Sequence, residues 1–105
     1  MNAPAPRVAL EGQTLAVSGE VDADSVIALR KAGERLISQA TGPLTVDLSA
    51  LATAHSAVLS MLLCWQRLAI QRSLQLAFRG GSERLVSLAA LSNLDDQIPG
   101  FAVHG

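Results

Sequence analysis

The chain has 105 residues, of which 50% are hydrophobic, and its formal net charge is -1. This length supplies apolar material for one hydrophobic core and too little for two, so the sequence predicts a single domain. The Lys and Arg residues are scattered singly and the aromatic residues are one Trp and two Phe, which argues against nucleic-acid binding.

The cysteine content and the N-terminal segment bear on the compartment. The single cysteine, Cys64, excludes an internal disulfide and a cysteine-rich zinc site, and it fits the reducing cytoplasm. Residues 1–6 lack the charge and apolar core of a signal peptide, so we expect a flexible lead before a domain spanning residues 7–105. The apolar stretch from Ala57 to Trp65 is about half of a membrane span, so any membrane association is expected to require a partner.

A β-hairpin is the first predicted element. Residues 7–11 and 14–19 have the pattern of two short strands. The residue count assigns Glu11, Gly12 and Gln13 to the link between them, a length that suits a hairpin. The leading strands should therefore be antiparallel.

A helix is predicted next, within the segment from Val21 to Ala40. Asp22 or Asp24 can cap its start, and Thr41-Gly42-Pro43 ends it. Apolar residues recur at helical spacing, while the charged residues fall mainly on other faces. The buried stripe is expected to contain Val26, Leu29, Gly33, Leu36, Ile37 and Ala40.

The second half alternates strands and helices. Leu44–Leu48 is predicted as a strand without strict alternation, which indicates cover on both faces. A helix from Ser56 to about Arg72, a strand over 74–78 and a helix over 82–92 follow, and residues 98–103 could add a strand. This order predicts an α/β fold with a mixed four- to five-stranded sheet flanked by three helices, the later strands parallel.

Ser56 occupies the junction between a strand and a helix. The stretch Thr45–Ser49 is expected to end in an acidic-polar turn. A loop through His55 then places Ser56 at the first position of the helix. A serine there can cap the helix, which typically contributes roughly 1 kcal/mol. A phosphate on it would instead add about two negative charges to the surface. The residues alone leave both roles open.

One stripe of the same helix is expected to face solvent. Ser56, Ser60, Arg67 and Gln71 share it at about 100° per residue, and Leu63 and Cys64 lie within it. The opposite face, expected to be buried, carries Val58, Leu62, Trp65 and Ala69. The exposed stripe is either a docking patch for another protein or the slightly apolar surface of a stable monomer.

The sequence predicts no enzyme, metal site or cofactor. His55 adjoins Ser56, but neighbouring residues rarely point at each other as a catalytic triad requires. The other histidine, His104, is in the tail, and no zinc-ligand spacing emerges. The turn Arg79-Gly80-Gly81 precedes a helix but lacks the lysine of a phosphate-binding loop.

Four segments together resemble a known family. They are Val46-Asp47-Leu48-Ser49, His55-Ser56-Ala57, Ser18-Gly19-Glu20-Val21-Asp22, and the leucines Leu85, Leu88, Leu91 and Leu94. Over about residues 7–101 the chain resembles a STAS domain, the fold of anti-sigma-factor antagonists. In that family D-L-S is followed by D-S/T-x-G, and its Ser or Thr, the phosphorylation or partner-binding position, matches Ser56.

Two departures from the family pattern bear on function. His55 stands where Asp is common, and Ala57 and Val58 stand where a small residue or glycine is usual. The chain is therefore more similar to the STAS subunit of an Mla-type phospholipid ABC transporter. The resemblance implies a non-catalytic subunit that binds the transporter ATPase and stabilises or regulates it, at the cytoplasmic side of the inner membrane. The implied partner-binding residues are His55, Ser56, Ala57, Ser60, Leu63 and Arg67.

The alternative that the resemblance implies is an anti-sigma-factor antagonist. Ser56 would then be phosphorylated by an anti-sigma factor kinase. The two alternatives differ in their partner, which is the transporter ATPase in one and the kinase in the other.

Overall fold

The computed structural model describes residues 5–52, 56–94 and 97–98, and they form an α/β fold. The sheet has the order β1-β2-β3-β4, with β1 antiparallel to β2 and the later strands parallel. This confirms the mixed sheet and the three helices. The elements are β1 Arg7–Glu11, β2 Thr14–Gly19, α1 Val26–Gln39, β3 Leu44–Leu51, α2 Ser56–Gln71, β4 Leu76–Arg79 and α3 Glu83–Leu91.

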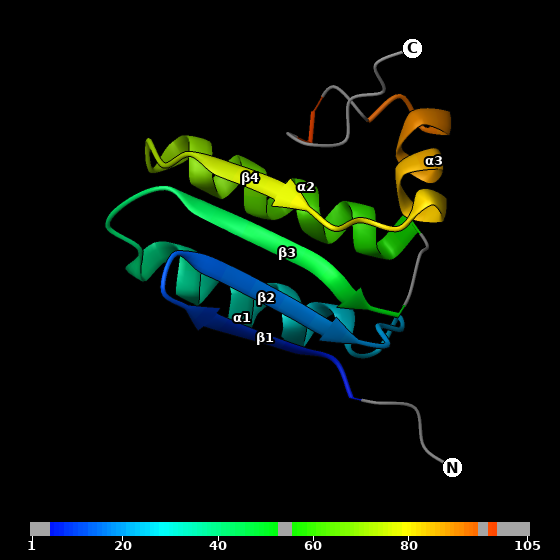
Figure 1. Ribbon diagram of the computed structural model, residues 1–105, viewed down its shortest axis with the longest axis horizontal. Helices are drawn as coiled ribbons and strands as arrows, with labels where there is room; N and C mark the ends of the chain where they lie inside the picture. The colour runs from blue at the N-terminus through cyan, green and yellow to red at the C-terminus, as the bar shows by residue number, and fades with distance from the viewer. Residues whose placement is uncertain (1–4, 53–55, 95–96, 99–105) are drawn as a thin grey trace.

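One face of the sheet carries the helical layer. Figure 1 shows α1 and α2 behind the strands and no described helix in front of them. In β3, Leu44, Val46 and Leu48 are buried, whereas Thr45 and Asp47 between them are only half-buried. The expectation that this strand is covered on both faces was therefore wrong, because its residues alternate with the period of two that a half-covered sheet requires.

The hairpin link is shorter than predicted. Glu11 pairs with Thr14, so it belongs to β1, and Gly12 and Gln13 alone connect the strands. Gly12 has a φ of +63°, a conformation that glycine adopts without the steric cost of a side chain. The prediction of a three-residue link was wrong because the pairing of the two strands extends to Glu11, the last residue before the turn.

A capping turn precedes α1. Asp22 Oδ1 accepts the backbone N–H of Asp24 at 3.0 Å and of Ser25 at 2.8 Å. The backbone N–H of Asp22 donates in return to Ser25 Oγ at 2.9 Å. These reciprocal bonds close the turn directly before α1, whose N-cap residue, Ser25, makes no side-chain cap hydrogen bond. Of the two candidate carboxylates, Asp22 is therefore the one that organises the start of the helix. The helix ends at Gln39, before the predicted stop.

The two long helices pack through a small residue against a large one. Trp65 of α2 is fully buried, and its Nε1 donates to the backbone oxygen of Arg30 on α1 at 3.0 Å. A Cβ at Gly33 would lie 2.2 Å from the Trp65 ring, so the close approach of α1 requires glycine there. The predicted core residues of α2 are all buried, namely Val58, Leu62, Trp65 and Ala69.

The α1 stripe and the C-terminal elements agree in part with the predictions. Leu29, Gly33 and Ile37 are buried, and the other three stripe residues, Val26, Leu36 and Ala40, are half-buried. α3 begins after Ser82, whose Oγ accepts the backbone N–H of Leu85 at 3.1 Å. Ile98 is buried and is not in a strand, and the remainder of the strand predicted over residues 98–103 lies outside the described residues.

Candidate functional site

β3 continues past the point where the sequence predicted a turn. It runs to Leu51, and Asp47 and Ser49 lie within it. The pairing with β2 shifts between Ala16, opposite Asp47, and Ser18, opposite Ala50. The extra β3 residue in this interval forms a β-bulge, which bends the strand and changes the direction of its C-terminal end. The predicted acidic-polar turn was wrong because the polar residues occupy the half-covered face of a strand.

Asp47 is the common acceptor in a hydrogen-bonded cluster, at the point where the middle of β3 lies beside the end of β4. Its Oδ1 accepts from Ser49 Oγ at 2.7 Å and from the Ser49 backbone N–H at 3.1 Å. Its Oδ2 lies 3.7 Å from Arg79 Nη2 on the neighbouring strand. The pKa of Asp47 is held below its usual value, first by the Ser49 hydroxyl, then by the Ser49 amide, and less by the charge of Arg79.

Gly80 completes this cluster. It has a φ of +74°, and a Cβ there would lie 2.8 Å from the Ser49 backbone nitrogen and 3.0 Å from Asp47 Oδ1. The chain after β4 therefore packs directly against the end of β3. The Asp47-Leu48-Ser49 motif has a structural role at this point, because its bonds fix the conformation of β3 shortly before the chain leaves it for α2.

Ser56 is the first residue of α2 and is exposed. This confirms the position predicted for it at the start of the helix. His55 lies outside the described residues. The part that Ser56 plays, as a cap or in a partner contact, stays a prediction.

The α2 stripe, which comprises Ser56, Ser60, Leu63 and Arg67, lies on the side of α2 away from the sheet. Ser56, Ser60 and Arg67 are exposed. Leu63 is half-buried and packs against the core, so it contributes less apolar surface than predicted. Ala57, also half-buried, faces the neighbouring helix. Apart from His55, the predicted partner-binding residues therefore share one region of α2.

A groove adjoins the α2 stripe where the first turns of α1 and α2 lie together. Its volume is about 310 Å³. Ile27 of α1 is 54% exposed beside it, and Arg30 pairs with Glu34 at 3.2 Å. This α1–α2 groove is lined by Val26, Ile27, Arg30, Ala57, Ser60, Met61 and Cys64.

The contribution of α1 to this region was not predicted from the sequence. Ile27 is an apolar residue outside the buried stripe of its helix, and that mismatch was the signal available in the sequence. Ile27 lines a groove only because α2 lies beside α1, and the residue pattern of α1 alone does not reveal that neighbour.

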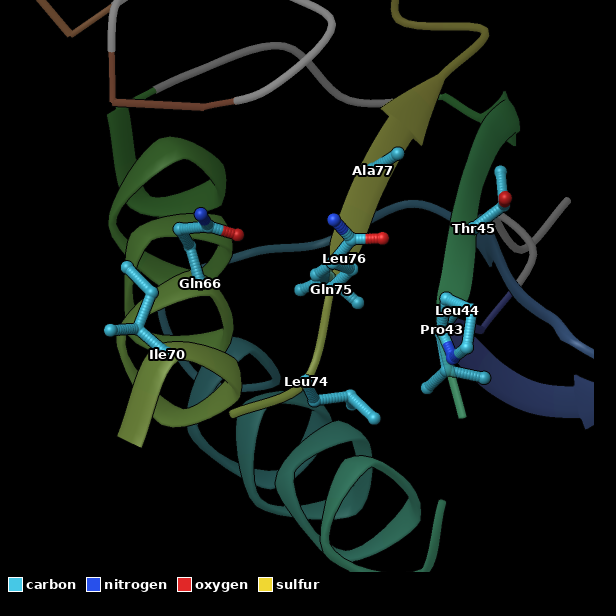
Figure 2. A pocket seen from close by; sticks show the side chains of 9 residues that line it. All are labelled: Pro43, Leu44, Thr45, Gln66, Ile70, Leu74, Gln75, Leu76 and Ala77. Carbon is cyan, nitrogen blue, oxygen red and sulfur yellow. The ribbon is translucent and has the colours of Figure 1, made fainter. Parts of the chain in front are cut away.

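A larger hollow of about 520 Å³ lies between the second half of α2 and the strands β3 and β4. Figure 2 shows Gln66 and Ile70 on α2, with Leu76 and Ala77 on β4 across from them. None of the described residues that line it has a titratable side chain. The lining residues are Pro43, Leu44, Thr45, Gln66, Ile70, Leu74, Gln75, Leu76 and Ala77.

Metal-ligand clusters and membrane-spanning helices are both absent from the described residues. No group of three or more His, Cys, Asp or Glu side chains that could hold a metal ion occurs among them. Within the same part of the chain, no helix has the length and apolar character needed to cross a bilayer.

Comparison with known proteins agrees with this arrangement. The chain matches the protein family described as "Mlab, STAS domain" over residues 5–101. No curated protein matches it at a significant level.

Three solved structures share the fold. The anti-sigma factor antagonist SpoIIAA in its unphosphorylated form has 17% identity and a TM-score of 0.70, over 95% of this chain and 90% of that one. An anti-sigma factor antagonist from Mycobacterium paratuberculosis has 23% identity and a TM-score of 0.67, over 93% and 85%. A STAS domain protein from Planctomyces limnophilus, described as an anti-sigma-factor antagonist, has 16% identity and a TM-score of 0.66, over 94% and 91%.

Proposed function

We propose that this chain, which belongs to the MlaB-type STAS domain family, is a non-catalytic subunit that binds the ATPase of an Mla-type phospholipid ABC transporter and stabilises or regulates it. Such a subunit would be cytoplasmic and would reach the inner membrane only through the transporter. The family match, rather than the solved structures, supports this choice of partner, since identities below 25% carry the fold alone.

The α2 stripe and the α1–α2 groove form the proposed docking surface. The groove supplies an apolar centre with Ile27, and Ser56, Ser60 and Arg67 supply a polar border. An apolar centre within a polar rim is the usual composition of a protein interface. The observation that carries the proposal is that Ser60 belongs to both features, so one partner can cover them together.

The alternative function is an anti-sigma-factor antagonist that is switched by phosphorylation. The exposure of Ser56 at the first position of α2 supports it, because a kinase must reach the hydroxyl. A phosphate at a helix N-terminus is also favoured locally by the backbone amides and the helix dipole.

The test of the docking surface is Ser56→Glu. Glutamate is tolerated at a helix N-terminus but would have to lose its hydration in an interface, so we expect at least about tenfold weaker capture of the ATPase. Circular dichroism should show an unchanged fold, and a pull-down against the co-expressed ATPase measures the binding.

The matched control is Ser87→Glu, an exposed serine on α3 outside the proposed surface. Its capture of the ATPase should equal that of the parent protein. Equal capture by a folded Ser56→Glu protein would refute the proposed surface.

A further inference from the structure

We propose that a second copy of this chain pairs with β1 through an antiparallel β1–β1 contact, which joins the described four-stranded sheets of the two copies into one of eight strands. β1 is an edge strand, because β2 is its only strand neighbour in the described part of the chain. Figure 1 shows it at the border of the sheet, on the side away from β4. Four properties of β1 indicate that the strand that pairs with its open edge is β1 of a second copy of this chain.

The first property is the direction of its backbone groups. In a hairpin with a two-residue link, the pair beside the link is hydrogen-bonded, and bonded and non-bonded pairs then alternate. Glu11–Thr14, Ala9–Ala16 and Arg7–Ser18 are therefore the bonded pairs of this hairpin. Val8 and Leu10 direct their N–H and C=O groups toward the open edge.

The second property is a register that satisfies these groups. When Ala9 lies on a two-fold axis, Val8 of the first copy faces Leu10 of the second, and Leu10 of the first copy faces Val8 of the second. Each of these two pairs can exchange two backbone hydrogen bonds, so the outward groups of both residues are used. Ala9 then faces Ala9 in a non-bonded pair, in which the Cα atoms approach to about 4.5 Å and a small side chain fits best.

The third property is charge. The same register places Arg7 of one copy opposite Glu11 of the other, twice, on one face of the joined sheet. Within the described part of a single copy neither residue forms an ion pair, and both are exposed. Opposite charges directly across an antiparallel pair stabilise it, whereas a parallel pairing in register would place like charges together.

The fourth property is shape. Leu10 is 37% exposed, and its side chain lies on the helix-covered face because it pairs with the buried Leu15. The register brings it beside Val8 of the other copy, which borders a hollow of about 400 Å³ between β1 and α1. The exposed leucine thus meets an apolar recess, which is lined by Pro6, Arg7, Val8, Ser25, Ala28, Leu29 and Ala32.

This contact is separate from the proposed docking surface. α1 lies behind β1 and β2, and α2 lies behind β3 and β4 (Figure 1). The hollow beside β1 is lined by the N-cap residue Ser25 and by Ala28, Leu29 and Ala32 of α1, whereas the α1–α2 groove is lined on α1 by Val26, Ile27 and Arg30, so the two surfaces use different residues of α1. A dimer through β1 would leave both copies of the α2 stripe accessible, so it could hold two copies of a partner. The inference does not rest on the proposed function.

The primary experiment is sedimentation velocity of the purified full chain at concentrations from about 5 to 500 µM. This range covers the dissociation constants expected of a small interface. We expect a concentration-dependent monomer–dimer equilibrium. Ala9→Lys, at an exposed position of the strand, should weaken the dimer at least about tenfold, because it places two ammonium groups together on the axis. Ala77→Lys, an exposed alanine on the β4 strand, is the matched control and should dimerise like the parent.

A charge exchange tests the register. Arg7→Glu and Glu11→Arg should each weaken self-association roughly tenfold, since each variant opposes like charges at both ends of the strand. An equimolar mixture of the two variants should recover association, and so should the double variant.

The amides of Val8 and Leu10 give an independent measurement. Their hydrogen exchange should slow as the protein concentration rises, because these backbone N–H groups are hydrogen-bonded in the dimer and open to solvent in the monomer. A purely monomeric chain at 500 µM would overturn the proposal. A dimer that is unaffected by Ala9→Lys, or one whose charge variants do not recover on mixing, would equally overturn it.

Discussion

At the residue scale, Gly33 sets the distance between α1 and α2. Alanine is normally about 1 kcal/mol better than glycine inside a helix. At this position, however, a Cβ would overlap the ring of Trp65, which is fully buried and bonded to Arg30. We expect Gly33→Ala to lower the free energy of unfolding by about 1–3 kcal/mol, as overpacking does.

Urea unfolding followed by the fluorescence of the single tryptophan measures this loss. Gly42→Ala is the matched control, because a Cβ at Gly42 meets nothing within 4 Å. It should change the free energy of unfolding by no more than about 1 kcal/mol. A Gly33→Ala protein at least as stable as the parent would contradict the packing described.

Asp47 ties stability to pH at the same scale. Its pKa in the folded chain lies below the ordinary 3.8, so the folded state holds this carboxylate ionised where the unfolded chain begins to take up a proton. The stabilisation is therefore fully present above about pH 4, and it is lost as the pH falls through the folded-state pKa. Asp47→Asn should remove part of the acid sensitivity of the parent.

Chemical unfolding at a series of pH values from about 2.5 to 6 tests this expectation, a range that brackets carboxylate titration. Asp24→Asn, at an exposed carboxylate in the turn before α1, controls for the change in net charge. The expectation fails if Asp47→Asn and the parent lose stability in parallel on acidification.

At the element scale, neighbouring leucines of α2 distinguish its two faces. Leu62 is fully buried, whereas Leu63 is half-buried at the margin of the core. A buried unpaired carboxylate costs several kcal/mol, so Leu62→Asp should unfold most of a domain of ordinary stability. Leu63→Asp should cost about 1–2 kcal/mol, stay folded and weaken partner capture.

Thermal unfolding by circular dichroism separates the two variants, and the pull-down used for Ser56 measures binding. If both variants unfold alike, Leu63 belongs to the core and the α2 stripe loses its apolar member. If Leu63→Asp stays folded and binds the ATPase normally, the stripe is not the docking surface.

At the scale of the whole molecule, membrane association distinguishes the two proposed functions. We expect tagged protein in the membrane fraction only when the transporter ATPase and permease are present, and without phosphate on Ser56. No helix among the described residues could span a bilayer, and the Lys and Arg residues are scattered along the sequence, so the expected route to the membrane is the transporter.

Fractionation with and without the transporter, followed by intact mass of the bound form, measures this. A strain that lacks the permease but keeps the ATPase controls for binding to the ATPase alone. Protein that never enters the membrane fraction, carries phosphate on Ser56 and co-purifies with a kinase would instead support the anti-sigma-factor antagonist.

The sequence by itself determined the features that depend on near neighbours along the chain. The period of α2 identified Val58, Leu62, Trp65 and Ala69 as buried, and Ser56, Ser60 and Arg67 as exposed. Helical spacing is a local property, so no knowledge of the other elements was needed. The motifs around Asp47 and Ser56 likewise indicated the family that the match over residues 5–101 shows.

Only the tertiary structure decided the features that depend on distant neighbours. The bulge that carries β3 to Leu51 exists because of its pairing with β2, and Asp47 meets Arg79 because β4 lies beside β3. The α1–α2 groove likewise requires Ile27 and Ser60, which are far apart in sequence, to lie together. Strand pairing and helix packing join residues across the whole chain, and a pattern read along a single element carries no information about its neighbour.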